Sequence, residues 1–107
     1  MTPSSCKIVS YQRPGCLTPP QAKGLRAGAV VLKPGDMMDW HSTRQREELI
    51  VVVEGRIALE LQSTARRRRT VSLLAGRCAF LPSRVLHRVV NRSKAPARYL
   101  YVTAPVT

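Results

Sequence analysis

Acidic and aromatic residues are scarce in this chain of 107 residues. It has 6 Asp and Glu against 18 Lys and Arg, a formal net charge of +12, and only 5% aromatic residues. Such a charge favours solubility and the attraction of anions. We do not expect specific nucleic-acid binding, because the chain has few rings for base stacking and no helix-turn-helix, zinc-finger, RNP or KH pattern.

Long apolar runs and paired cysteines are also missing. The apolar run at 49–53 is far shorter than the about 18 residues of a membrane-spanning helix. We therefore expect no membrane association, and the first residues do not resemble a secretory signal. The three cysteines have no C-x-x-C spacing, which argues against a disulfide framework and favours a reducing, cytoplasmic location. Cys78 stands in an apolar run and is expected to be buried.

Turn-forming residues, in contrast, are spread along the whole chain. Eight Pro and six Gly separate short runs rich in β-formers. The expected strands are 7–11, 25–35, 48–55, 56–62, 70–76, 78–82, 86–91 and 97–104. Many short strands between turn signals are typical of an all-β sandwich or barrel, and no helical periodicity is convincing. We expect an irregular lead-in over 1–24 and one barrel domain over 25–107.

Four consecutive arginines, Arg66 to Arg69, form the one low-complexity run. They follow the strand expected at 56–62 and precede the next one. The run is interpreted as a charged hairpin tip or a blunted edge strand, which discourages edge-to-edge pairing. An anion-binding patch is the alternative interpretation.

Two groups of residues stand at a fixed spacing. The first group reads Gly35, His41, Thr43, Glu48 and Gly55, and the second reads Gly76, Pro82, Arg84, His87 and Asn91. Together they resemble the two signature motifs of the cupin superfamily, with eight of the ten positions matching in order. The resemblance implies a double-stranded β-helix, that is, a jelly-roll β-barrel. It also implies a metal inside the barrel.

The strand pattern gives a separate reason to expect a site. Glu48 shares a strand face with Ile50 and Val52, and side chains alternate between faces along a strand. A carboxylate in that position is partly buried and needs a cation, a hydrogen-bond donor or a metal. Glu47 points to the opposite face, and on the second strand His87 points inward while Arg88 points outward.

The resemblance places both histidines of the chain at ligand positions. His41, Glu48 and His87 would hold a divalent transition metal (Fe, Mn, Zn, Ni or Cu), because two imidazoles and a carboxylate suit these ions. Thr43 stands where the family usually has a further histidine, and Arg84 replaces a glycine. Thr43, Arg84, Trp40 and Asn91 are the candidates for the substrate end and the surroundings of the metal.

Two functions remain open at this point. One is a metal-dependent enzyme acting on a small anionic substrate. The other is a non-catalytic small-molecule-binding or sensor cupin with a degenerate or empty metal site, in which His87 is simply bonded to Glu48. Fold alone does not choose between them.

The run at 49–53 also predicts a partner. Leu49, Val51 and Val53 face away from Ile50 and Val52, so the strand is apolar on both faces and should be covered on both. A small barrel without helices would obtain that cover from a second copy. We therefore expect a homodimer, to which the lead-in contributes.

Overall fold

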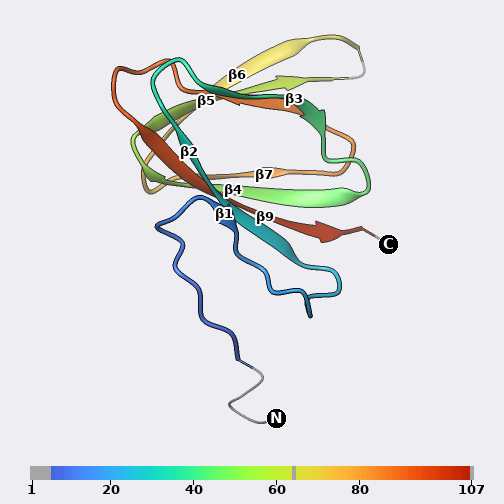
Figure 1. The fold of residues 1–107 in the computed structure, drawn as a ribbon. Helices are drawn as coiled ribbons and strands as arrows, with labels where there is room; N and C mark the ends of the chain where they lie inside the picture. Colours follow the sequence, from blue (N-terminus) through green and yellow to red (C-terminus); the bar gives the residue numbers. More distant parts are fainter. Residues whose placement is uncertain (1–5, 64, 107) are drawn as a thin grey trace.

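The computed structural model describes residues 6–63 and 65–106 and forms two stacked antiparallel sheets (Figure 1). The strands are β1 (Gly15–Cys16), β2 (Arg26–Leu32), β3 (Met37–Ser42), β4 (Arg46–Glu54), β5 (Arg56–Gln62), β6 (Arg68–Leu74), β7 (Cys78–Leu81), β8 (Leu86–Val90) and β9 (Ala97–Pro105). One sheet has the order β1-β2-β9-β4-β7 and the other β3-β8-β5-β6. This confirms the all-β double-stranded β-helix predicted from the sequence. Within the described ranges no helix is long and apolar enough to cross a membrane.

The core lies between the two sheets and follows the alternation of side chains. Ile50 and Val52 of β4 are at most 1% exposed, and they face Ile57 and Leu59 of β5, which are equally buried. Burial of each such side chain stabilises the fold by roughly 1.5–3 kcal/mol. The strictly alternating pattern of 56–62 thus correctly predicts which face of β5 is inside.

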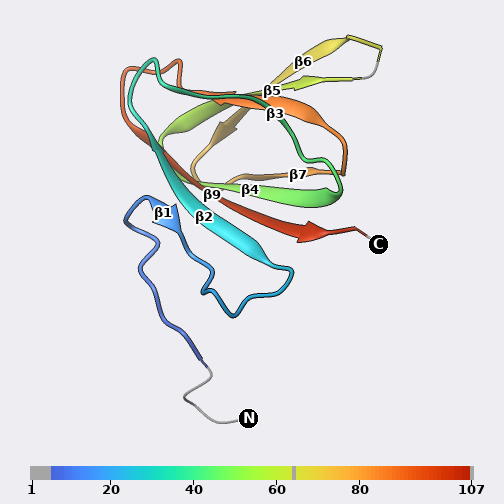
Figure 2. The same ribbon diagram turned by 45° about the vertical axis from the view of Figure 1, so that its right-hand side comes forward.

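The start of the chain differs from the expectation. No strand forms over 7–11, where the backbone is irregular and then turns. Instead the two-residue β1 lies within the expected lead-in and pairs with β2, with Gly15 opposite Ala29. Residues 6–10 extend away from the barrel in both views (Figures 1 and 2). Among the residues that the structure describes, this segment pairs with no strand.

Two further predictions are corrected by the structure. Cys78 is exposed, not buried. It lies opposite Val51 on β4 and therefore points to the outer side of the sheet, while Ala79 and Leu81 point inward. The second correction is β3, which the sequence did not predict as a strand. Its residues, Met37–Ser42, lack an alternating pattern and are mostly exposed.

The arginine run is divided between a turn and an edge strand. Arg68 and Arg69 belong to β6, the outermost strand of its sheet, whereas Arg66 and Arg67 lie in the turn before it. All four side chains are exposed. This arrangement agrees with a charged, blunted edge.

Candidate metal centre

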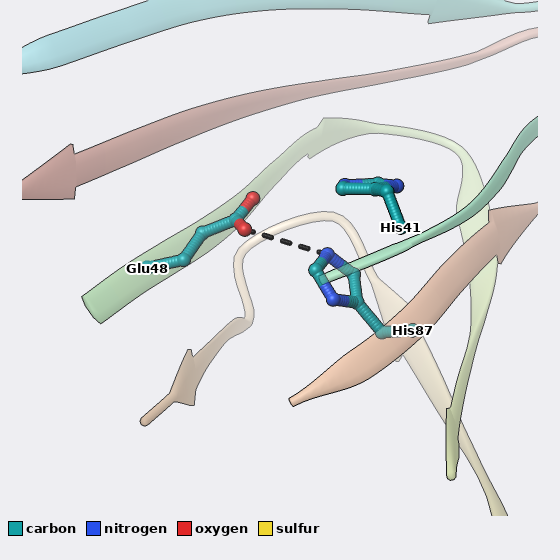
Figure 3. Close-up of side chains that lie close together, drawn as sticks. All are labelled: His41, Glu48 and His87. Carbon is teal, nitrogen blue, oxygen red and sulfur yellow. Dashed lines mark ion pairs between the residues drawn. The ribbon is translucent and has the colours of Figure 1, made fainter. Parts of the chain in front are cut away.

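Three side chains from three strands meet inside the barrel. His41 comes from β3, Glu48 from β4 and His87 from β8, and Figure 3 shows them converging from opposite walls. Their potential ligand atoms all lie within 4.8 Å of one another. The sequence therefore predicted correctly that these residues come together.

Strand register brings the two histidines side by side. His41 and His87 are direct partners in the β3–β8 ladder, after an irregularity between Met38 and His41 that resets the pairing. The centroids of the two rings are 4.2 Å apart. A bulge of this kind re-aims the side chain that follows it. In this protein it directs His41 toward His87.

Both imidazoles are oriented by the backbone in the same way. The Nδ1 atom of His41 lies 2.7 Å from the carbonyl oxygen of Asp39, and Nδ1 of His87 lies 3.1 Å from that of Val85. A carbonyl oxygen only accepts, so each Nδ1–H donates and each neutral ring keeps a lone pair on Nε2. Histidines that bind metals are commonly fixed by such a bond.

The buried end of His87 lacks a hydrogen-bond partner. His87 is fully buried, and its Nε2 atom is the one buried side-chain nitrogen or oxygen without a hydrogen bond among the described residues. It lies 3.4 Å from Oε1 of Glu48. In the neutral tautomer, both the nitrogen and the carboxylate are acceptors. A cation between them would satisfy both, so the residues fit a divalent metal.

Glu48 is 8% exposed and shares the inner face of β4 with Ile50. Within the described part of the chain, His87 is the only group at ion-pair distance from its carboxylate. A buried carboxylate with so little compensation is costly. The burial of Glu48 thus also indicates that these residues fit a divalent metal.

The three side chains line an open cavity of about 940 Å³. The inward face of β9 contributes Tyr99, Tyr101 and Thr103. Tyr101 packs against Gly28 on β2, where an added Cβ would clash with the tyrosine ring and hydroxyl. The lead-in supplies another wall with Thr18, Pro19 and Pro20 among others. Arg46 ties that wall to the barrel through hydrogen bonds to the carbonyl oxygens of Gly24 and Thr103.

Tyr99 is a buried side chain that lines the cavity. Burial raises the pKa of its hydroxyl well above the usual value, and the nearby negative charge of Glu48 makes a smaller contribution. The hydroxyl therefore remains protonated at any physiological pH. From the sequence, Tyr99 and Tyr101 are expected to be core or interface residues rather than site residues, although alternation along 97–104 places them with Thr103 on one face.

Thr43 lines the cavity, but its hydroxyl is engaged elsewhere. It donates to the carbonyl oxygen of Pro82 at 2.9 Å and accepts from the Val85 N–H at 3.0 Å. Thr43 is 6% exposed. The side chain thus joins the β3–β4 turn to the β7–β8 turn, on the strand edge that carries His87.

The other three candidates lie outside the cavity. Trp40 is on the outer face of its sheet, with the guanidinium groups of Arg88 and Arg68 at 5.0 and 5.2 Å from the ring. Asn91 is fully buried and binds the carbonyl oxygens of Leu32 and Ala95. These contacts hold the end of β8 in place and do not involve His41, Glu48 or His87.

Arg84 stands at the family's glycine position and adopts a positive φ of 63°. Its N–H donates to the carbonyl oxygen of Arg44, which also has a positive φ, of 54°. The backbone therefore keeps the left-handed turn that glycine would favour, at a cost of about 1 kcal/mol. Arg84 lines a second cavity beside the first, of about 640 Å³, together with Arg44 and Arg46.

Comparison with known proteins agrees with this geometry. The family model described as "Cupin domain" matches residues 28–103. A search of curated proteins found no match. Among solved structures, an uncharacterized conserved protein with a double-stranded beta-helix domain from Klebsiella pneumoniae is similar with a TM-score of 0.79. The two share 15% identity, over 94% of this chain and 90% of that one.

Two longer proteins are similar over part of their length. Peruvianin-I, a cysteine peptidase from Thevetia peruviana latex, has a TM-score of 0.71 and 23% identity over 77% of this chain and 51% of its own. Oxalate decarboxylase from Lactobacillus farciminis, solved as a formate complex, has a TM-score of 0.73 and 26% identity over 82% of this chain and 26% of its own. The chain thus spans about half of the first protein and a quarter of the second.

Proposed function

The chain belongs to the cupin superfamily, and from this premise we propose that it holds a divalent transition metal ion through His41, Glu48 and His87 and binds a small anionic molecule beside it. The observation that carries the proposal is the buried Nε2 atom of His87, which has no hydrogen-bond partner and faces the carboxylate of Glu48 at 3.4 Å. Two imidazoles and one carboxylate suit Fe, Mn, Zn, Ni or Cu.

When bound, such a metal polarises a carbonyl group or lowers the pKa of a bound water. The chain's own groups supply the rest of the site. Asp39 and Val85 orient the two imidazoles through their carbonyl oxygens. Tyr99 offers a buried hydroxyl, and Tyr101 and the lead-in residues line the rest of the cavity.

Arginine side chains beside the site favour an anionic ligand. Arg46 lines both cavities, and Arg44 and Arg84 line the second. The net charge of +12 adds a long-range attraction for anions. The similarity to a protein named oxalate decarboxylase, solved with formate, supports small carboxylates as the first ligands to test.

A second candidate is a non-catalytic binding or sensor protein with a degenerate site. Thr43 favours this function, because it stands where the family usually has a further histidine and its hydroxyl is hydrogen-bonded to the backbone. Three ligands bind a metal less tightly than four. Metal content therefore separates an occupied site from a degenerate one.

The first experiment measures metal content. Protein purified without a metal-affinity tag is stripped with a chelator, incubated in turn with Mn, Fe, Zn, Ni and Cu salts, desalted and analysed for elements. We expect about one equivalent of one metal in wild type and in Glu47→Gln, whose carboxylate is on the opposite face. His87→Ala should lose it.

The opposite outcome is equally clear. Wild type that stays metal-free with all five salts excludes the metal site and leaves the degenerate binding protein as the leading function. If metal binds, oxalate is added to the loaded protein, and its loss is followed by ¹³C NMR. Binding of oxalate by calorimetry without turnover would indicate a sensor rather than an enzyme for this ligand.

A further inference from the structure

The second cavity is lined by three arginines and, among the described residues, by no acidic side chain. Arg44, Arg46 and Arg84 share it with Ser42 and Gln45, and the end of β9 lies beside them. Its volume of about 640 Å³ falls in the range that is typical of small-molecule sites. The cavity therefore has the size and the charge of a binding site for a small anion.

Two turns present Arg44 and Arg84 at this cavity. Arg44 lies between β3 and β4 and Arg84 between β7 and β8, and both turns lie at the same end of the barrel (Figures 1 and 2). The Arg84 N–H donates to the carbonyl oxygen of Arg44 at 2.7 Å, and the Thr43 N–H donates to that of Val85 at 3.2 Å. The Thr43 hydroxyl adds two further hydrogen bonds between the same turns. The backbone thus holds the two arginines next to each other.

Both arginines adopt a backbone conformation that favours glycine. Their φ angles are 54° for Arg44 and 63° for Arg84. Each such position costs about 1 kcal/mol for a residue with a side chain, and strained positions of this kind cluster at ligand sites. Two adjacent left-handed positions that both carry arginine indicate that the side chains are needed there, because glycine would form the same turns without strain.

The guanidinium groups of Arg44 and Arg84 form no ion pair within the described part of the chain. The two arginines at Glu60, in contrast, are paired with its carboxylate. Arg46 uses its guanidinium group for hydrogen bonds to backbone oxygens, and these leave its positive charge uncompensated. Like charges around one cavity repel each other, and an anion with more than one negative charge relieves that repulsion.

We propose that the second cavity binds the phosphate group of a small phosphorylated molecule. Guanidinium groups bind phosphate oxygens through paired, charge-assisted hydrogen bonds, and a phosphate group carries up to two negative charges where a carboxylate carries one. Because Ser42 and Arg46 line both cavities, the phosphate lies next to the metal centre. The inference rests on the proposed function only for the rest of the ligand, since binding of the phosphate itself does not require the metal.

The test is a titration of the metal-free full chain with inorganic phosphate, followed by ¹H–¹⁵N NMR. Sodium chloride at about 150 mM screens the diffuse attraction that a net charge of +12 exerts on any anion. The amide signals of Arg44 and Arg84 should shift saturably, with a dissociation constant on the order of 1 mM or lower. No saturable shift of these signals up to about 20 mM phosphate would overturn the proposal.

Glycine variants assign the site. Arg44→Gly and Arg84→Gly each remove one guanidinium group and suit the left-handed turn, so both should fold and each should weaken phosphate binding at least about tenfold. Arg66→Gly is the matched control, because Arg66 is also exposed and has a φ of 61°, but it lies between β5 and β6. It should change the affinity less than about twofold. Equal weakening in all three variants would mean that net charge alone attracts phosphate, and would contradict the site.

A second pair of probes identifies the source of the phosphate. Glycerol 3-phosphate should compete with inorganic phosphate, whereas vesicles of phosphatidylcholine and phosphatidylglycerol should bind wild type and Arg84→Gly alike. Vesicle binding that Arg84→Gly loses and Arg66→Gly keeps would assign the cavity to a membrane surface and exclude the small ligand. Because these titrations use metal-free protein, their outcome is independent of the metal-content experiment, and either proposal can fail while the other stands.

Discussion

Glu48 and Glu60 are buried carboxylates in opposite sheets, and they differ in their ion-pair partners. Glu60, on the outer face of β5, is 6% exposed and binds two arginines: Arg88, at 2.9 Å, and Arg92. Glu48, on the inner face of β4, is 8% exposed, and of the described groups only the Nε2 atom of His87 lies at ion-pair distance, 3.4 Å away. One carboxylate is fully paired by its own chain and the other is not.

This difference distinguishes a structural ion pair, at Glu60, from a candidate metal site, at Glu48. Glu60 keeps its charge because two guanidinium groups donate to it, so nothing from outside the chain is needed. The protein has 18 Lys and Arg, but within the described residues none lies at ion-pair distance from Glu48. A chain so rich in arginine and lysine that gives this carboxylate only a histidine at 3.4 Å has a position suited to a cation from solution. The proposed metal depends on this contrast.

The largest expected effect concerns metal affinity. Glu48→Gln removes a charged ligand, and we expect the metal affinity to fall about 100-fold or more, whereas Glu60→Gln should change it less than about threefold. Calorimetric titration with the metal identified by elemental analysis measures both. Without metal, Glu48→Gln should be at least as stable as wild type, because an unpaired buried charge has been removed. Equal losses of affinity in both variants would remove the distinction between the two carboxylates.

The next largest effect is on the free energy of unfolding of the metal-free protein. Removing the charge of Glu60 should lower it, whereas removing the charge of Glu48 should not. Glu60→Gln leaves Arg88 and Arg92 without their partner and should lower the free energy of unfolding by about 1–2 kcal/mol. Both arginines can still reach water, which limits the loss. Urea unfolding of the metal-free protein measures it. Glu47→Gln, an exposed neighbour of Glu48, is the control and should stay within about 0.5 kcal/mol of wild type.

Thr43 is an uncharged residue whose polar group, like that of Glu60, is already paired within the chain. Its hydroxyl is paired on both sides by backbone, as Glu60 is by arginines, so we expect a structural role. Thr43→Val should cost about 1 kcal/mol of stability while metal stoichiometry is unchanged. Urea unfolding and elemental analysis of the same sample provide the two measurements. Loss of the metal with unchanged stability would instead place the hydroxyl at the metal.

The smallest effect is on the pH dependence of stability. Burial raises the pKa of Glu60, but hydrogen bonds from Arg92 and Arg88 together outweigh it and hold that pKa below the usual value. The pair therefore stabilises the fold fully above the unfolded-state pKa of about 4.3, and this contribution is lost as the pH falls through the lower folded-state pKa. Wild type should lose more stability than Glu60→Gln between about pH 5 and 3. Parallel curves for the two proteins would be inconsistent with a lowered pKa.

Much of the fold and the three ligands could be predicted from the sequence. Alternation in β4 and β8 indicates that Glu48 and His87 point inward while Glu47 and Arg88 point outward, and motif spacing adds His41. The two-sheet fold follows from the short strands between turn residues. These predictions hold because alternation and turn chemistry depend only on neighbouring residues.

Other features could not be predicted in this way. The segment Met37–Ser42 has no alternating pattern, so the sequence predicts neither β3 nor its irregular pairing. For the same reason it does not show that Trp40, a candidate for the surroundings of the metal, lies on the outer face. The burial of Glu60 depends on Arg92, which lies 32 residues away. The cavity wall formed by the lead-in depends on the contact between Arg46 and Gly24.

The sequence by itself thus determined which side chains lie on the same face of a strand, because that is a local property of an extended backbone. Only the tertiary structure decided which faces meet. It set the register that pairs His41 with His87, brought two arginines to Glu60, and left Glu48 without a guanidinium group. Pairing between distant segments depends on the packing of the whole barrel. This packing makes Glu60 part of a structural ion pair and leaves Glu48 as a candidate metal ligand.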